Sequence, residues 1–200
     1  MTETTTFDPR SHRLAEPAAF EDMKVGSKWP IPSRTMTDAM FAAFQSASGD
    51  NHPIHYDVEY CKAHGHPNLL AHGMQVLIQS AAGAGQLAAA MEENLIAFLE
   101  TTGKFLKPVY AGDTVYPMLE VVEVTPQNTT GVVVVRSTIH NQKGELVFEG
   151  TQKYLMRKQA ATDRARRQRR KQNRRRGMPR RRFRFPRADA RQIFVIIRTS

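Results

Sequence analysis

Five runs rich in β-branched and aromatic residues, separated by polar turns, dominate the stretch between residues 95 and 156. The runs cover residues 95–100, 104–110, 114–124, 131–140 and 145–156, with turn-forming residues at 110–113, 126–128 and 141–144. Such runs are typical of β-strands. Short turns can connect antiparallel strands, whereas parallel strands need long crossovers. The pattern therefore predicts a meander of long antiparallel strands.

The residues that precede these runs predict helices. Thr37 is the expected N-cap of a short amphipathic helix ending near Gly49, and residues 57–63 are expected to form another brief helix. Residues 72–91 are apolar on most sides and rich in small residues. We expect one long helix from His72 to about Met91, buried nearly all round.

A buried helix followed by an antiparallel meander implies an α+β fold, with the sheet wrapped around the long central helix. A single such layer leaves a sheet edge uncovered. We therefore expect a symmetric homodimer.

The formal net charge of +10 combines two very different regions. Residues 1–157 hold 12 Lys and Arg against 17 Asp and Glu, a net charge of −5, whereas residues 158–200 hold 17 against 2, a net charge of +15. We expect a flexible segment over residues 1–15, one domain over residues 16–157, and an Arg-rich disordered tail over residues 158–200.

The Arg-rich tail has three interpretations. It could bind the phosphate backbone of RNA or DNA, it could be a solvated arm, or it could be a sequence not under selection, such as the translation of an altered reading frame. The abrupt break after the last expected strand and the isolated apolar run at residues 193–197 favour the second or the third interpretation over nucleic-acid binding.

Cysteine content and hydropathy bear on the compartment. The single cysteine, Cys61, excludes an intramolecular disulfide and fits a reducing environment. Residues 1–20 lack the apolar segment of a secretory signal, and no stretch has the length and apolarity of a membrane span. These features predict a cytoplasmic protein without membrane contact.

Asp50 and His55 lie five positions apart in a loop that contains Gly49 and Pro53. A carboxylate and an imidazole at this spacing can meet at one water molecule or substrate atom, which suits general acid–base catalysis. On residue types alone, the more ordinary interpretation is a helix exit, with Asp50 in an Asx-turn and His55 in the core.

Four segments, in order, resemble the MaoC-like and R-specific enoyl-CoA hydratase family. Residues 48–55, Ser-Gly-Asp-Asn-His-Pro-Ile-His, are similar to the family's Ser/Thr-Gly-Asp-x-Asn-Pro-Ile/Leu-His loop. Residues 71–74 resemble the second motif of the family, residues 105–113 its strand and turn, and residues 20–26 its usual entry. The chain departs from the pattern at His52, where the family has Asn.

This resemblance implies a hot-dog fold, usually dimeric, that acts on acyl thioesters of coenzyme A or acyl carrier protein. Asp50 and His55 match the family's catalytic dyad, and Gly73 matches its oxyanion-hole amide. The implied activity is that of a lyase that hydrates a trans-2-enoyl thioester or dehydrates the (3R)-3-hydroxyacyl thioester. It requires no metal and no organic cofactor, because coenzyme A or acyl carrier protein is part of the substrate.

Two alternatives remain open. A hot-dog acyl-CoA thioesterase would use the same scaffold for hydrolysis. A non-catalytic acyl-thioester-binding or nucleic-acid-associated protein would fit the altered order Asn51-His52 and the basic tail.

The histidines between residues 52 and 72 also raise the question of a metal site. They lack a metal-binding framework, so no metal is expected. We expect His64 and His66 in a surface loop and a positional role for His72.

Overall fold

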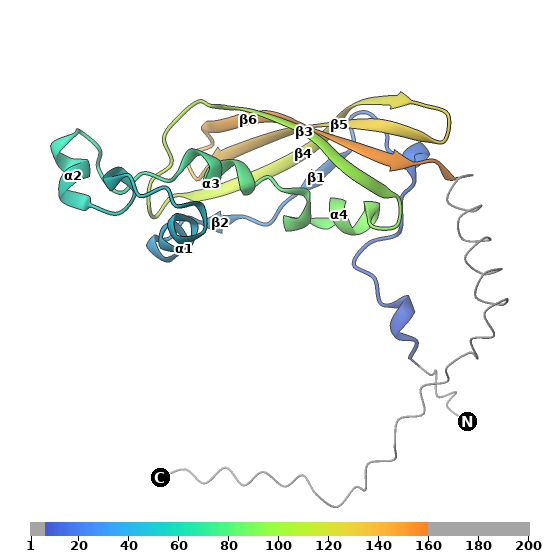
Figure 1. Ribbon diagram of the computed structural model, residues 1–200, viewed down its shortest axis with the longest axis horizontal. Helices are drawn as coiled ribbons and strands as arrows, with labels where there is room; N and C mark the ends of the chain where they lie inside the picture. Colours follow the sequence, from blue (N-terminus) through green and yellow to red (C-terminus); the bar gives the residue numbers. More distant parts are fainter. Residues whose placement is uncertain (1–6, 160–200) are drawn as a thin grey trace, which may run out of the picture. The chain divides into compact units, whose positions relative to one another are not determined.

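The computed structural model describes residues 7–159, in which a sheet carries helices along one face (Figure 1). All of these residues lie within one compact unit of the chain. The predictions for residues 1–6 and for the Arg-rich tail from residue 160 onward fall outside the described part. The domain boundary at residue 157 stays a prediction.

Six strands form one antiparallel sheet in the order β1-β4-β5-β6-β3, and β2 also pairs with β4. The strands are β1 (Lys28–Pro30), β2 (Arg34–Thr35), β3 (Leu95–Phe105), β4 (Thr114–Pro126), β5 (Thr130–Asn141) and β6 (Leu146–Arg157). The predicted antiparallel strands are therefore confirmed, and β4, β5 and β6 form a meander. The meander does not include β3, which pairs with β6 and not with β4, the next strand in sequence.

One pair of predicted strands differs from the structure. Residues 95–100 and 104–110 were expected as two strands, but β3 runs unbroken through Gly103 to Phe105. Gly103 faces Gly150 across the ladder, and the Phe148 ring fills the space above Gly103, where a Cβ would lie 2.5 Å from that ring. Gly103 thus provides room for a ring within a continuous strand and does not end the strand.

Four α-helices and four 3-10 turns occur in the described residues. They are η1 (Pro9–Ser11), η2 (Phe20–Asp22), α1 (Asp38–Ser48), η3 (Pro53–His55), α2 (Val58–Ala63), α3 (Gly73–Ile78), η4 (Ala82–Ala84) and α4 (Gln86–Met91). The two short helices expected before residue 72 are confirmed as α1 and α2. The Thr37 side chain caps α1 by accepting from the N–H of Met40 at 3.3 Å, as predicted.

The prediction of one continuous helix from His72 to Met91 was wrong. The segment consists of α3, η4 and α4, with extended backbone at Ala81 and Gly85 between them. The Ser80 main-chain carbonyl accepts from Nε2 of Gln152 at 2.9 Å, so this acceptor is paired with a side chain of the sheet where α3 ends. Gly85 passes so close to β1 that a Cβ there would lie 3.0 Å from the Ile31 side chain. Side-chain bonding and close packing thus favour the break over a regular helix.

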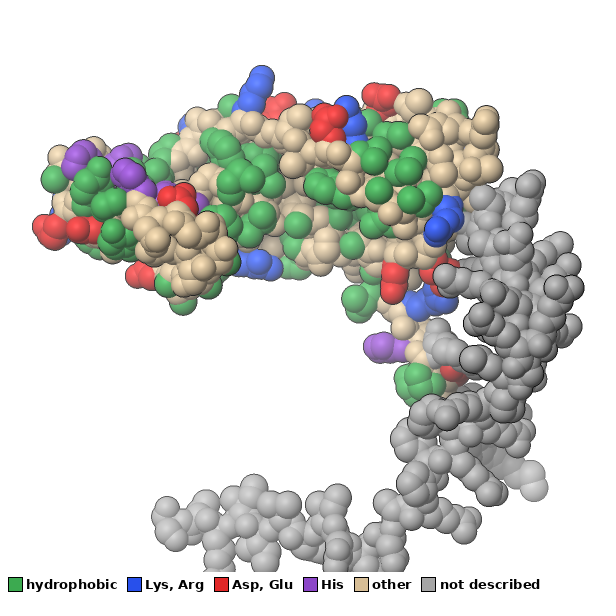
Figure 2. All heavy atoms as spheres, in the orientation of Figure 1, with side chains coloured by type: hydrophobic (Ala, Val, Ile, Leu, Met, Phe, Trp, Pro, Cys, Tyr) green, Lys and Arg blue, Asp and Glu red, His purple; other side chains and the backbone are tan. Residues whose placement is uncertain are grey.

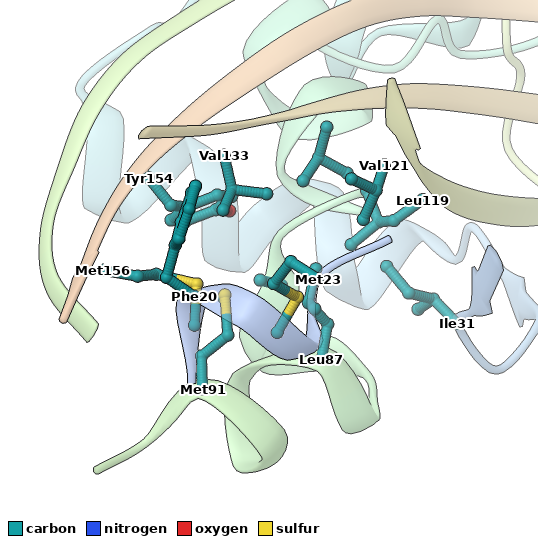
Figure 3. Packing of buried hydrophobic residues seen from close by; sticks show 12 residues of the cluster. Phe20, Met23, Ile31, Leu87, Met91, Leu119, Val121, Val133, Tyr154 and Met156 are labelled. Carbon is teal, nitrogen blue, oxygen red and sulfur yellow. The ribbon is translucent and has the colours of Figure 1, made fainter. Parts of the chain in front are cut away.

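Two clusters of buried apolar side chains lie between the sheet and the helices. The first lies between the sheet and the helices α4 and η2, and includes Phe20, Leu87, Met91, Leu119 and Tyr154 (Figure 3). The second lies toward α1 and α3 and includes Phe41, Val76, Val115 and Phe148. The second cluster packs against α1 and α3, which flank the candidate site.

Candidate active site

The loop between α1 and α2 carries the predicted dyad. Gly49 ends α1 in the left-handed region, with φ of 73°, and its N–H donates to the Gln45 carbonyl. Glycine adopts this conformation without steric cost, which lets the chain leave the helix sharply. The 3-10 turn η3 then presents His55 toward the interior, where it is buried.

His52, at which the chain departs from the family pattern, caps η3. Its Nδ1 accepts from the N–H of Ile54 at 3.3 Å. Asn commonly makes this type of capping bond through its side-chain oxygen, so His52 supplies a comparable acceptor at the same position. Asn51 turns elsewhere: its Oδ1 accepts from Gln45 Nε2 at 2.7 Å, and its Nδ2 donates to the Gly49 carbonyl.

The tautomer of His55 follows from its hydrogen bond. Its Nδ1 lies 2.6 Å from the main-chain oxygen of Leu70, which can only accept, so Nδ1 carries the proton. In the neutral ring, Nε2 is then an acceptor. This atom lies 3.9 Å from Oδ2 of Asp50, too far for a direct hydrogen bond. Two acceptors at this separation can both receive protons from one water molecule lying beside them.

Burial lowers the pKa of His55 from its usual value of 6.5, and the neighbouring His72 and His52 act in the same direction. The bond to the Leu70 carbonyl and the charge of Asp50 oppose this shift, but burial is the largest influence. The neutral form of the ring, which can accept a proton, is therefore favoured. The Asp50 side chain is 53% exposed and open to solvent.

His55 lines a cavity of about 410 Å³ together with Gly73. The other lining residues are Leu70, Ala71, Val76, Phe105, Leu106, Lys107, Pro108 and Val109. Gly73 is the first residue of α3, so its N–H has no carbonyl four residues earlier within the helix. A Cβ at Gly73 would lie 3.3 Å from the Phe105 ring, so glycine keeps this wall of the cavity open.

All three sequence-predicted site residues therefore converge. Asp50 and His55 meet across 3.9 Å, and Gly73 shares the cavity of His55. Figure 2 shows most of the histidine side chains visible on this face gathered at the end of the domain that carries α1 and α2. Sequence reasoning missed the Leu70 carbonyl, because a main-chain acceptor leaves no trace in residue type.

His64 and His66 lie in the loop that follows α2, as expected. His64 is exposed and stacks on Tyr60, and Nδ1 of His66 lies 3.2 Å from the Tyr110 hydroxyl. Both side chains are thus occupied outside the candidate site.

The donor atoms of Asp50, His55 and His72 lie within 4.8 Å of one another, close enough to test as a metal site. Nδ1 of His55 is bonded to the Leu70 carbonyl, and His72 Nε2 lies 3.1 Å from the Asp50 carbonyl. Nδ1 of His72 in turn lies 3.3 Å from the Gln75 side chain, which leaves the Asp50 carboxylate and one nitrogen of His55 as atoms free to bind a metal. Zinc sites in proteins use three or four such ligands. The absence of a metal remains a prediction.

The chain is similar over its domain to a protein from Mycobacterium tuberculosis with a double hot-dog fold, at 26% identity and a TM-score of 0.62, covering 71% of this chain and 44% of that chain. The domain is therefore a hot-dog domain, and the predicted fold class is confirmed.

A family model described as a MaoC-like domain matches residues 23–143, and the chain belongs to this family. Among solved structures, it is similar to a monoamine oxidase regulatory protein from Archaeoglobus, at 32% identity and a TM-score of 0.68, covering 74% of this chain and 99% of that one. It is also similar to the R-hydratase PhaJ1 from Pseudomonas aeruginosa, at 25% identity and a TM-score of 0.61, covering 70% and 86%.

Within residues 7–159, no helix has the length and apolarity needed to cross a membrane.

Proposed function

We propose that this protein hydrates trans-2-enoyl thioesters, or dehydrates the corresponding (3R)-3-hydroxyacyl thioesters, with coenzyme A or acyl carrier protein as part of the substrate. The observation that carries the proposal is the pair of acceptors formed by Asp50 Oδ2 and His55 Nε2, 3.9 Å apart beside a cavity that Gly73 lines. Similarity to an R-hydratase supports the same class of reaction.

In the hydration direction, Asp50 and His55 hold one water molecule. His55 Nε2 takes a proton from this water as its oxygen bonds to C3 of the enoyl group. The electron pair of the C2=C3 bond moves toward the thioester carbonyl, and the resulting oxyanion accepts a hydrogen bond from the Gly73 N–H. The protonated His55 then returns the proton to C2, so one water is added across the double bond.

The cavity suits an acyl thioester in shape as well as chemistry. Apolar side chains, among them Val76, Phe105 and Val109, form most of its wall, while His55, Lys107 and the main chain at Gly73 supply polar groups. A mostly apolar wall with a few convergent polar groups is typical of small-molecule sites.

We also propose that the working unit is a homodimer formed along β3. This strand is at the edge of the sheet, and Phe98, Leu99 and Phe105 on it are each about half exposed. Apolar edge strands favour pairing with another chain. The match to the protein with a double hot-dog fold covers 44% of that protein, which corresponds to one of its two hot-dog units. A second copy of this chain would supply the other unit. Sedimentation analysis at micromolar concentration would test this: a monomer would contradict the proposal.

A substrate panel tests the function. Crotonyl-CoA, longer enoyl-CoA and branched enoyl-CoA should each be followed by loss of the enoyl absorbance and by release of free thiol. Hydration is expected to remove the absorbance without releasing thiol. Thiol release would instead identify a thioesterase, and binding without turnover would identify a non-catalytic acyl-thioester-binding protein.

The pH dependence of hydration should follow the protonation of His55. Only the neutral ring accepts the proton of water, and burial lowers the pKa of His55 below its usual 6.5. We therefore expect kcat/KM for an enoyl-CoA to rise with pH through a pKa below 6.5 and to be level above it. Initial rates between about pH 5 and pH 8 would measure this profile. An acidic limb centred above 6.5 would contradict the assignment of His55 as the base.

A further inference from the structure

Asp50 and His55 make no direct hydrogen bond to each other, so other residues must fix their relative positions. Asp50 lies in the exposed loop after α1, and His55 ends η3. A water-activating pair needs both groups fixed in position, since a misplacement of about 1 Å can cost about 10²-fold in rate. A further residue must therefore restrain the loop relative to the ring.

His72 makes contact with both halves of the dyad. Its ring stacks on the His55 ring, with centroids 3.7 Å apart and planes 21° from parallel. Its Nε2 lies 3.1 Å from the main-chain oxygen of Asp50. That oxygen can only accept, so Nε2 of His72 carries a proton and donates it there.

The His72 side chain is itself immobilised. It is 1% exposed, and the rings of Phe41 and Phe44 on α1 pack against it at centroid distances of 6.4 and 4.9 Å. Its Nδ1 lies 3.3 Å from the amide end of the buried Gln75 side chain, one turn along α3. Because Nε2 carries the proton, Nδ1 accepts, and the group that donates to it is the amide NH2 of Gln75. A buried ring with contacts on its face, its edge and both nitrogens has little freedom to rotate.

We propose that His72 is a positioning residue, which sets the plane of the His55 ring by stacking and holds the Asp50 main chain by donating a hydrogen bond. The expected loss of kcat in His72 variants rests on the proposed hydratase function. It assigns His72 no proton transfer, since its Nε2 proton is committed to the Asp50 carbonyl.

Two substitutions separate the two contacts. His72→Phe keeps a planar ring for stacking but has no donor for the Asp50 carbonyl. His72→Gln keeps a side-chain N–H donor but has no ring. Each is expected to lower kcat on an enoyl-CoA by about 10- to 10²-fold, with a much smaller change in KM, because both displace the reacting groups and leave the wall of the cavity intact.

His64 provides a matched control. Like His72, it stacks on a neighbouring ring, that of Tyr60 at 4.0 Å, and its Nδ1 bonds a main-chain carbonyl, that of Tyr60 at 2.8 Å. It lies outside the site and is exposed. His64→Phe and His64→Gln should therefore leave kcat unchanged.

A spectroscopic measurement distinguishes positioning from a merely structural role. The ring signals of His55 in nuclear magnetic resonance spectra should be single and sharp in the unsubstituted protein. They should broaden or double in His72→Gln, while circular dichroism shows the same fold. Should either substitution prevent folding, Gln75→Leu, which removes the Nδ1 partner at similar side-chain size, should show a smaller effect in the same direction.

The outcomes for the two proposals are distinct. Unchanged kcat and unchanged His55 signals in folded His72 variants would overturn the positioning role and leave the hydratase proposal intact. If the unsubstituted protein turned over no enoyl thioester, the hydratase proposal would fail, and the His55 signals alone would decide whether His72 positions the ring.

Discussion

Asp50→Asn and His55→Gln should each lower kcat on an enoyl-CoA substrate by about 10²-fold or more, the scale expected of a positioned acid or base. Asn keeps the shape of Asp50 but accepts far less strongly from water. Gln keeps part of the hydrogen bonding of His55 but cannot take up a proton. Steady-state hydration kinetics on each folded variant would measure the loss.

The double substitution sharpens this test. Because Asp50 Oδ2 and His55 Nε2 would act on one water, the variant lacking both should lose much less than the product of the two single losses. His64→Gln and His66→Gln change histidines outside the site and should leave the rate nearly unchanged. Full activity in both single dyad variants, with folding confirmed, would exclude the proposed mechanism and leave the fold assignment in place.

Gly73→Pro should lower kcat by about 10²- to 10³-fold, the usual effect of removing one oxyanion donor. Proline lacks the N–H that would bind the thioester oxygen, yet it is well tolerated at the first position of a helix. The preceding residue, His72, has φ of −59° and ψ of 137°, a conformation that also suits a residue before proline. The helix should therefore form while the donor is lost, and hydration kinetics would measure the effect.

Gly73→Ala is the matched control for this substitution. Both variants add a Cβ, which would lie 3.3 Å from the Phe105 ring, but only alanine keeps the N–H. Phe105 is half exposed and can move by the few tenths of an ångström required. Equal losses in the two variants would mean that the added carbon, and not the missing donor, impairs turnover.

Much of the fold was predictable from local patterns. Runs of strand-forming residues separated by turns predicted β4, β5 and β6 to within a few residues, and Thr37 and Gly49 marked the two ends of α1. These features depend on nearby residues only. The break between α3 and α4 was not predictable in this way, because it depends on the approach of Gly85 to Ile31, which lies more than fifty residues earlier.

The candidate site shows the same division. The residues Asp50, His55 and Gly73 were selected from the sequence through their order and types, and the structure brings them together. Their hydrogen-bonding environment was not predictable: the Leu70 carbonyl that fixes the tautomer of His55 belongs to the main chain, and the stacking of His72 on His55 joins residues seventeen positions apart. The sequence predicted a positional role for His72, but it did not predict the contacts of His72 with the His55 ring and the Asp50 carbonyl.

The break at residues 79–85 divides the helical layer into two halves with separate apolar supports. A continuous helix would tend to form and open as one unit, because helix formation is cooperative. Here α3 lies with the cluster around Phe148, and α4 lies with the cluster around Leu119. Amide hydrogen exchange should accordingly separate the domain into two opening units. We therefore expect substitutions in the cluster around Leu119 to disturb the geometry of the dyad less than substitutions in the cluster around Phe148.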